Sequence, residues 1–290
     1  MTRDNFKSYI ALISSMLIFG TLGIFRRYIP LSSAMLAVFR GLLGCAFLLV
    51  FVFAKGGRRP RLDRKSLFML VITGAIMGFN WMLLFEAYNY TTVAAATMCY
   101  YMQPTIVILL SPFVFRERLG LKKLLCALIA IIGMVFVSGV LGDGRVQAQD
   151  VRGILFGLGA AAFYSAVVIL NKKIENDDIY EKSVIQLAAA AAVMLPYVLL
   201  TEDVSQLALS SSAVAMVLIV GIVHTGLAYA LYFGSMKKLK AQTIAVMSYI
   251  DPVFALLLSA VVLHEKLSVL GIVGSVLILG SALASETAAA

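Results

Sequence analysis

The chain carries one pattern twice, first as YMQPTIVILLSPFVFRERL at residues 101–119 and again as YIDPVFALLLSAVVLHEKL at residues 249–267. A tyrosine, a proline three residues later, a Leu-Leu-Ser run and a closing Glu-[Arg/Lys]-Leu keep the same spacing in both copies. The offset of 148 positions pairs Pro104 with Pro252 and Glu117 with Glu265. Each copy contains a long apolar run, which is typical of a membrane-spanning helix. The pattern therefore predicts a duplicated membrane protein.

The composition excludes an ordinary soluble domain. Of the 290 residues, 61% are hydrophobic and 13% are charged, and the mean hydropathy is +0.96. The net charge of +9 is spread between apolar runs rather than gathered on one polar face, so it indicates membrane topology and not nucleic-acid binding. Cys45, Cys99 and Cys126 fall inside apolar runs, where we expect them to serve packing.

Ten apolar segments come close to the length that a membrane-spanning helix needs, about 20 residues. We therefore predict an all-α polytopic membrane protein with ten transmembrane helices. Charged and polar residues separate the segments, with end points uncertain by about two to four residues. The predicted helices cover residues 8–25, 32–54, 66–85, 92–115, 121–141, 153–170, 184–200, 213–233, 241–263 and 267–284.

Lysine and arginine in the loops predict the orientation, because cytoplasmic loops are enriched in both. If the N-terminus is cytoplasmic, eighteen of the 24 basic residues lie on the inner side and Arg40 lies within a span. Both termini are then expected in the cytoplasm. The five basic residues expected outside are Arg26, Arg27, Arg145, Arg152 and Lys266.

The duplication divides the chain into a first repeat at 1–145 and a second at 146–290. Each repeat would hold five helices, and an odd number makes the second copy enter the membrane from the opposite side. Inverted repeats of this kind let two halves open a central site alternately to each side. The architecture favours a transporter, and the alternative is a membrane scaffold without transport.

Several residues occupy the positions of motifs in a known family. The chain resembles the EamA-type branch of the drug/metabolite transporter superfamily, whose repeats end in a proline-containing helix, a Glu-Arg-Leu-like turn and a glycine-rich helix. The resemblance covers nearly the whole chain and implies export of amino acids and other metabolites. The matching residues are Pro104, Glu117-Arg118-Leu119 and Gly133 in the first half, Pro252, Glu265-Lys266-Leu267, Gly271, Gly274 and Gly280 in the second, and Arg40 in the second helix.

Pro104 and Pro252 lie near the middle of two predicted helices, where a proline removes a backbone donor and frees a carbonyl. A free carbonyl at that depth is tolerated when it faces protein or a water-filled cavity. We therefore expect both helices to line a central pathway, with simple helix kinks as the alternative. The polar residues beside the prolines are assigned to the substrate cavity: Tyr101, Gln103, Tyr249 and Asp251.

Asp251 is the most informative of these residues, because a carboxylate at the bilayer centre is costly and usually faces a cavity or a partner. It could bind a substrate amino group, take up a proton or act as a structural acceptor. Arg40 could pair with Asp251 or Glu86, attract a substrate carboxylate or extend to the interface, and we favour a structural ion pair. Glu86 lies near the outer boundary, where a solvated carboxylate is a better interpretation than a proton carrier.

Two further pairs of residues are candidates for the cavity. Asn80 and Trp81 bring an amide and a large ring toward mid-membrane, and packing is the equal alternative. His224 could titrate near neutrality, although a lone histidine is more often a satisfied core residue, and Tyr229 follows on the same helix.

Glu117 and Glu265 lie at turns between helices, where a carboxylate can cap the following helix. Their equivalent positions favour a structural role. Phosphate-binding loops of the Gly-x-x-x-x-Gly-Lys-[Ser/Thr] type, His-Glu-x-x-His and Gly-x-Ser-x-Gly are absent from the sequence, which argues against ATP use and enzyme activity.

The sequence thus predicts a secondary transporter in the cytoplasmic (inner) membrane that exports amino acids or related metabolites by alternating access, with proton coupling as one option. Its partners would be a small-molecule substrate, membrane lipid and protons, without cofactor, metal or nucleic acid. The alternatives are a transporter of cationic drugs, nucleotide sugars or lipids, and a scaffold.

Overall fold

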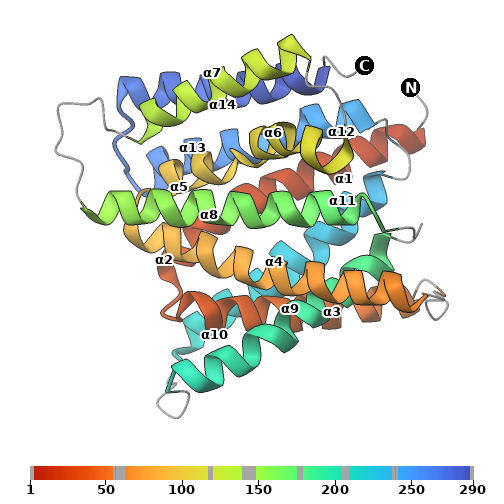
Figure 1. Ribbon diagram of the computed structural model, residues 1–290. Coiled ribbons are helices and arrows are strands. Elements are labelled where there is room, and N and C mark those ends of the chain that lie inside the picture. The colour runs from red at the N-terminus through yellow and green to blue at the C-terminus, as the bar shows by residue number, and fades with distance from the viewer. Residues whose placement is uncertain are drawn as a thin grey trace.

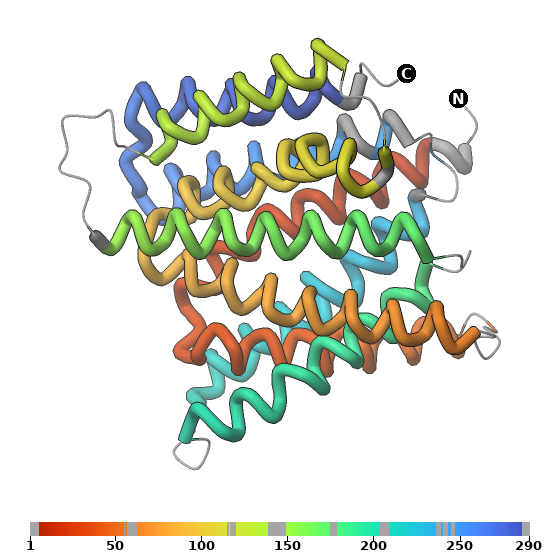
Figure 2. The backbone as a smooth tube through the Cα atoms, in the orientation of Figure 1, coloured from red at the N-terminus to blue at the C-terminus, as the bar shows by residue number. Residues whose placement is uncertain are grey.

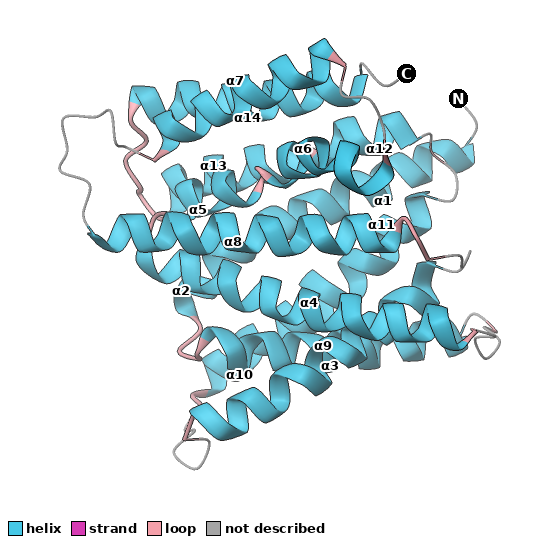
Figure 3. Ribbon diagram, viewed as in Figure 1, coloured by secondary structure: helices cyan, strands magenta, loops and turns pink. Residues whose placement is uncertain are grey.

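The computed structural model describes residues 3–54, 56, 63–116, 120–138, 148–174, 179–203, 209–236, 239 and 241–287. Within these ranges every regular element is a helix (Figure 3). The helices of the first half are α1 (Arg3–Gly20), α2 (Leu22–Tyr28), α3 (Ser33–Ala54), α4 (Arg64–Tyr90), α5 (Val93–Tyr100), α6 (Gln103–Phe115) and α7 (Leu121–Val137).

The second half is also helical, but its breaks are placed differently. Its elements are α8 (Ala148–Asn171), α9 (Ile179–Thr201), α10 (Ser211–Leu218), the π-helix η2 (Ile219–Leu227), α11 (Ala228–Met236), α12 (Ala241–Ser248), α13 (Ile250–Val262) and α14 (Val269–Thr287). The counterpart of α1 and α2 is the continuous α8, and the counterpart of α4 is divided into three elements.

Polar residues set the starts of several helices. Thr92 precedes α5 and its hydroxyl accepts the backbone N–H of Ala95 at 3.0 Å. Ser210 does the same for α10, accepting from Ala213 at 3.2 Å. These contacts satisfy donors that have no partner inside a helix, and each is worth about 1 kcal/mol. The apolar runs therefore become helices with defined beginnings.

Seven helical segments are long and apolar enough to cross a membrane, which confirms a polytopic membrane protein. The predicted segments 121–141 and 241–263 correspond to shorter helices, and the segment 267–284 corresponds to α14, whose apolar part is Val269–Ser285. Here α7 has 17 residues, and residues 241–263 are divided between α12 and α13. The count of ten spans stays a prediction. The seven segments are Phe6–Tyr28, Ser33–Ala54, Arg64–Tyr90, Val93–Val114, Gln149–Asn171, Ile179–Thr201 and Ser211–Ser235.

Helices of the first half are interleaved with helices of the second half, so the two halves form one bundle (Figures 1 and 2). Helix α4 contacts α8 and α9, α3 contacts α9 and η2, and α1 contacts α11 and α13. At one edge of the bundle α7 lies along α14 (Figure 1). The start of α1 and the end of α14 lie at the same end of the bundle (Figure 1). Any central site must therefore draw residues from both halves.

Two close helix contacts depend on glycine. A Cβ added to Gly74 of α4 would lie 2.5 Å from the carbonyl oxygen of Gln186 on α9. Gly133 of α7 and Gly274 of α14 face each other. A Cβ added to Gly133 would lie 2.7 Å from the carbonyl oxygen of Gly274, and one added to Gly274 would lie 2.5 Å from that of Gly133. Small residues let helix backbones approach closely in a membrane, where packing drives association.

Candidate functional site

A cavity of about 690 Å³ lies between the two halves of the chain. Its wall combines apolar side chains with an unusual number of tyrosines. The polar and charged residues that line it are Arg40, Tyr88, Thr97, Tyr100, Tyr101 and Gln103 from the first half, and Tyr164, Asn171, Ser183, Gln186, Tyr229, Tyr232, Ser248, Tyr249 and Asp251 from the second. Volumes of this size are typical of small-molecule sites.

The two prolines of the repeated pattern stand at breaks in helices that line the cavity. Helix α5 ends at Tyr100, and α6 begins with Gln103 and Pro104. Proline fits the first turn of a helix, because the N–H groups there have no partner within the helix. The second half repeats the arrangement at Tyr249, where α12 gives way to α13 and Pro252 lies in the first turn. Pro104 lines the cavity and Pro252 is buried beside it.

Asp251 and Tyr101 join these two breaks across the cavity. The Tyr101 hydroxyl donates to Oδ2 of Asp251 at 2.6 Å. A charge-assisted hydrogen bond of this length holds the carboxylate in place at the wall. Gln103 and Tyr249 also line the cavity, and Oε1 of Gln103 is buried without a hydrogen-bond partner among the described residues. The sequence had assigned all four residues to one site, and the structure brings them together.

Arg40 reaches the cavity from α3 and is only 4% exposed. Its Nε donates to the Thr225 hydroxyl at 2.8 Å, and its guanidinium carbon lies 4.4 Å from the centre of the Trp81 ring. Among the described residues Arg40 forms no ion pair with Asp251 or Glu86, the partners considered from the sequence. A guanidinium over an aromatic face is stabilised without a carboxylate, so its charge stays available to the cavity.

The π-helix η2 places Thr225 opposite Arg40. The Thr225 hydroxyl donates to the carbonyl of Val220, five residues earlier, at 3.1 Å, so its oxygen can accept from Arg40. Gly221 and Gly226 on the same element lie directly against Leu43 and Phe47 of α3. Single π-turns often mark functional sites, and this π-helix supplies the hydroxyl that accepts a hydrogen bond from Arg40.

Asn80 and His224 lie outside the cavity wall. Asn80 is fully buried and its Nδ2 donates to the carbonyl of Ala160 at 2.6 Å. Nε2 of His224 lies 2.7 Å from the Thr21 hydroxyl, at the junction of α1 and α2. Both side chains connect helices, which is the packing alternative considered from the sequence. Trp81 and Tyr229, their predicted companions, do line the cavity.

Glu86 and Glu265 are at one end of the bundle, away from the cavity. Glu86 accepts from the Ser33 hydroxyl at 2.6 Å and from Asn89 Nδ2 at 3.1 Å. Its partners are thus small polar groups. Arg26 reaches the same Ser33 hydroxyl at 3.3 Å.

Glu265 was expected to cap the following helix, α14. It caps α5 in the other half of the chain instead. Its two oxygens accept the backbone N–H groups of Val93 and Ala94 at 3.0 and 3.4 Å, at the start of α5 in the other half. Oε1 also pairs with Arg27 at 3.2 Å, and the Ser259 hydroxyl donates to Oε2. Two features direct Glu265 to α5: the turn before it passes through His264, a left-handed residue (φ 52°), and α13 packs against α5. Glu117, the counterpart of Glu265, lies outside the described residues.

Among the residues that the structure describes, the lining of the cavity extends to one end of the bundle. Its wall extends to Asn171 at the end of α8, to Ser183 at the start of α9 and to Leu239 beyond α11. Toward the other end the lining includes Gly23, Tyr88 and Thr97, and Gly23 and Thr97 are each one helical turn from residues bound to Glu265. The Glu265 contacts therefore lie between the cavity and that end.

The sequence analysis missed part of the aromatic wall. Tyr88, Tyr100 and Tyr164 line the cavity although none was assigned to it, and Tyr232, on the same predicted helix as Tyr229, lines it as well. The available signal was their position inside apolar helices, because a buried tyrosine hydroxyl needs a polar neighbour. Gln186 also lines the cavity and donates to Thr73 and Asn171.

Comparison with known proteins agrees with this arrangement. The profile of the EamA-like transporter family matches residues 6–139 and again residues 151–285. The chain belongs to the EamA-like transporter family. It therefore has two family repeats, and its helices make it a multi-pass membrane protein.

Relatives of this EamA-like protein are named as transporters. The uncharacterized transporter YxxF of Bacillus subtilis is 29% identical over 90% of this chain and 83% of its own. An uncharacterized transporter of Archaeoglobus fulgidus is 26% identical over 94% of both chains, and the uncharacterized inner membrane transporter YicL of Salmonella typhimurium is 23% identical over 95% and 93%. A crystal structure with a TM-score of 0.69 and 22% identity covers 96% of this chain and 95% of its own, and shares the fold.

Proposed function

We propose that this EamA-like protein is a secondary transporter that exports amino acids or related small metabolites across the cytoplasmic (inner) membrane. The observation that carries the proposal is the pair of opposite charges on the cavity wall, Arg40 from the first half and Asp251 from the second. Charged groups at this depth are costly and mark substrate or ion pathways.

The chemistry of the wall fits a zwitterion. The flat guanidinium of Arg40 can donate two parallel hydrogen bonds to a carboxylate. The Asp251 carboxylate, already oriented by Tyr101, can accept from an ammonium group. Apolar and aromatic residues fill the rest of the wall, where a variable side chain would pack.

Alternating access is part of the proposal. Ten spans, arranged as inverted repeats at 1–145 and 146–290 with cytoplasmic termini, would give the two halves equivalent positions on opposite sides of the membrane. The helix breaks at Pro104 and Pro252 supply irregular backbone next to the cavity, as in other transporters. The wall of the cavity reaches the end of the bundle that the positive-inside rule assigns to the cytoplasm. Substrate would then enter from the cytoplasm.

A second candidate is a transporter of organic cations. It is favoured by one observation, the cluster of aromatic rings beside the Asp251 carboxylate, since cations bind well over aromatic faces. The two candidate functions require different effects of the Arg40 charge on the substrate. A zwitterion needs its positive charge, whereas a cation is repelled by it.

Flux in proteoliposomes tests the proposal. Purified protein is supplied with labelled amino acids and labelled organic cations, with and without a pH gradient. We expect amino-acid flux that falls at least about tenfold in Asp251→Asn and in Arg40→Gln, because each loses one charge contact of the substrate. A pH gradient that accelerates flux in the wild type and not in Asp251→Asn would assign proton coupling to this carboxylate.

The control is Glu202→Gln, which removes a carboxylate bound to Ser32 at the end of the bundle. It should transport like the wild type. Wild-type flux in a folded Asp251→Asn protein would remove Asp251 from the mechanism. Cation flux that rises in Arg40→Gln would favour the second candidate, and no flux of either class would reject both.

A further inference from the structure

The two helix breaks at the cavity have nearly the same backbone. Helix α5 (Val93–Tyr100) and helix α12 (Ala241–Ser248) have eight residues each, and the repeat offset of 148 positions carries one exactly onto the other. Tyr101 follows α5 with φ −73° and ψ 3°, and Tyr249 follows α12 with φ −73° and ψ −6°. The two tyrosines are therefore equivalent in sequence and in local structure.

The side chains at these breaks make different contacts. The offset that pairs Tyr101 with Tyr249 also pairs Gln103 with Asp251. The Tyr101 hydroxyl donates to Asp251 of the other copy at 2.6 Å. The equivalent bond would run from the Tyr249 hydroxyl to Oε1 of Gln103, but that oxygen is buried without a hydrogen-bond partner among the described residues. An amide oxygen can accept from a hydroxyl as a carboxylate oxygen does, so acceptor chemistry does not explain the difference.

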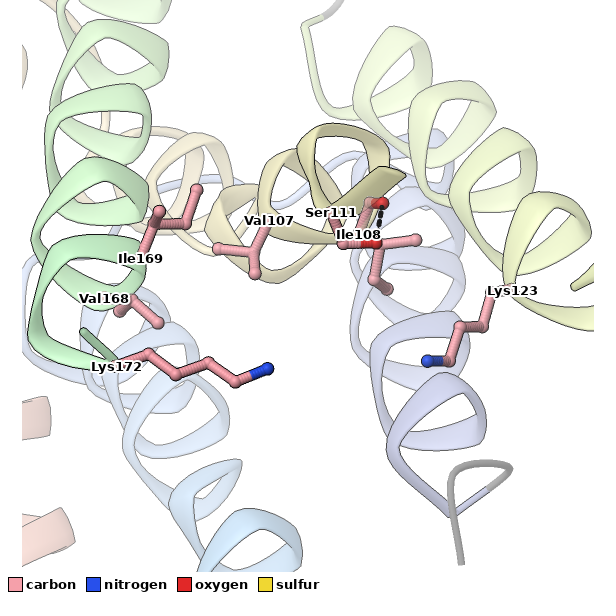
Figure 4. A pocket seen from close by; sticks show the side chains of 7 residues that line it. All are labelled: Val107, Ile108, Ser111, Lys123, Val168, Ile169 and Lys172. Atoms are coloured by element: carbon pink, nitrogen blue, oxygen red, sulfur yellow. Dashed lines mark hydrogen bonds between the residues drawn. The ribbon is translucent and has the colours of Figure 1, made fainter. Parts of the chain in front are cut away.

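Gln103 differs in this respect from Ser111, another polar residue of α6. The Ser111 hydroxyl donates to the carbonyl of Ile108 at 2.9 Å, beside a smaller pocket of about 200 Å³ that both residues line (Figure 4). Its own helix thus satisfies Ser111 in this state. A buried acceptor without a partner is costly and calls for a physical reason, such as a donor that reaches it in another state of the protein.

We propose that Gln103 is a positioning residue for the opposite state of the transport cycle, in which its Oε1 accepts from the Tyr249 hydroxyl. The inference rests on the alternating access proposed above. A pseudo-twofold exchange of the repeats carries the bond between Tyr101 and Asp251 onto Tyr249 and Gln103, and it opens the end that Glu265 closes. Tyr249 has interactions of its own in this state, and it would exchange them for Gln103.

The two bonds differ in strength, because only one acceptor is charged. A hydrogen bond to a carboxylate is roughly twice as strong as a bond between neutral groups. The bond between Tyr101 and Asp251 therefore favours the state in which the Glu265 end is closed. The neutral bond between Tyr249 and Gln103 keeps the opposite state accessible without making it the resting state.

Hydrogen exchange without substrate tests this assignment, and its result does not depend on which molecule is transported. The amides of Val93 and Ala94 are bound by Glu265, so they exchange when that end opens. Gln103→Met keeps the length of the side chain and removes the acceptor. Tyr249→Phe removes the donor.

The control is Tyr197→Phe, which makes the same change on a tyrosine of α9 that is 40% exposed and does not line the cavity. It should exchange like the wild type at the start of α5. Gln103→Glu restores an acceptor of similar length, so it should return exchange to the wild-type rate or above. Thermal unfolding checks that each variant is folded.

We expect exchange at Val93 and Ala94 to be about fivefold slower in Gln103→Met and in Tyr249→Phe, because the opposite state loses a bond. This factor corresponds to about 1 kcal/mol, which is typical of a neutral hydrogen bond. The double variant should be no slower than either single variant. Tyr101→Phe should accelerate exchange, since it weakens the closed state. A purely structural role would accelerate exchange in every variant, so the opposite signs identify positioning.

Unchanged or faster exchange in folded Gln103→Met protein would overturn the role of Gln103. Slower exchange in Gln103→Met but not in Tyr249→Phe would overturn the pairing of the two residues. Proteoliposome flux separates these failures from a failure of the proposed function. Amino-acid flux combined with unchanged exchange would keep the transporter and reject the role of Gln103. Slower exchange in both variants without amino-acid flux would reject the substrate and support the exchange of tyrosine bonds.

Discussion

Glu265 joins the two halves of the chain at one end of the bundle, and its replacement by glutamine tests whether this contact keeps that end closed. Glutamine has nearly the same shape but loses the charge and one acceptor. The carboxylate is held by two backbone N–H groups at the start of α5, by Arg27 and by Ser259. Its side chain is only 11% exposed, so water replaces these contacts poorly.

The magnitude can be worked from these contacts. Hydrogen bonds from a helix N-terminus to a carboxylate contribute about 1–2 kcal/mol, of which glutamine retains part. The ion pair with Arg27 adds at most about 0.5 kcal/mol, because the Arg27 side chain is 34% exposed and solvent screens it. We expect a net loss of about 1.5 kcal/mol, a factor of about ten in the population of the closed contact.

Hydrogen exchange at the start of α5 measures this loss directly. The amides of Val93 and Ala94 are bound by Glu265, so they should exchange about tenfold faster in Glu265→Gln. Glu202→Gln is the matched control, since it removes a carboxylate at the same end that does not contact α5. Unchanged exchange at these two amides in a folded Glu265→Gln protein would refute the reasoning.

Two further predictions concern the cavity and the packing. Tyr101→Phe removes the donor to Asp251 but keeps the ring, so we expect thermal stability to fall by about 1–3 kcal/mol and substrate KM to rise, measured by unfolding and by flux. Gly74→Ala should cost about 1–3 kcal/mol, because the new Cβ would lie 2.5 Å from a carbonyl oxygen of α9. Gly280→Ala should stabilise α14 slightly, because the new Cβ would have no described atom within 4 Å apart from the nearby backbone of its own helix. An equal loss in both variants would show that packing is not the cause.

Hydropathy and the repeated pattern predicted the helices and part of the cavity for a physical reason. Apolar runs long enough to cross a membrane become helices, because only a helix satisfies the backbone within one segment. A proline near the middle of such a run removes a donor, so it marks a break. Tyr101 lies three residues before Pro104 and Asp251 directly precedes Pro252, and the structure places both at the cavity.

The sequence alone could not predict contacts between segments that are distant along the chain. The Arg40 site depends on the π-helix, which turns Thr225 toward α3, and nothing in the pattern of residues 219–227 distinguishes a π-turn from an ordinary helix. Glu265 was expected to cap its own following helix, because local capping is the common case. Its partner helix begins 172 residues earlier, at Val93, and only the packing of α13 on α5 brings them together.

The two copies of the repeated pattern carry the same Leu-Leu-Ser run, and the second copy shows how its serine takes part in a contact between the halves. Ser259 donates to Glu265, which binds the start of α5 in the other half. The contacts of Glu265 lie at one end of the bundle, and the cavity wall extends to the opposite end. The proposed alternating access requires the two ends to exchange these states, so that Ser111 and Glu117 of the first copy would make the contacts that Ser259 and Glu265 make now.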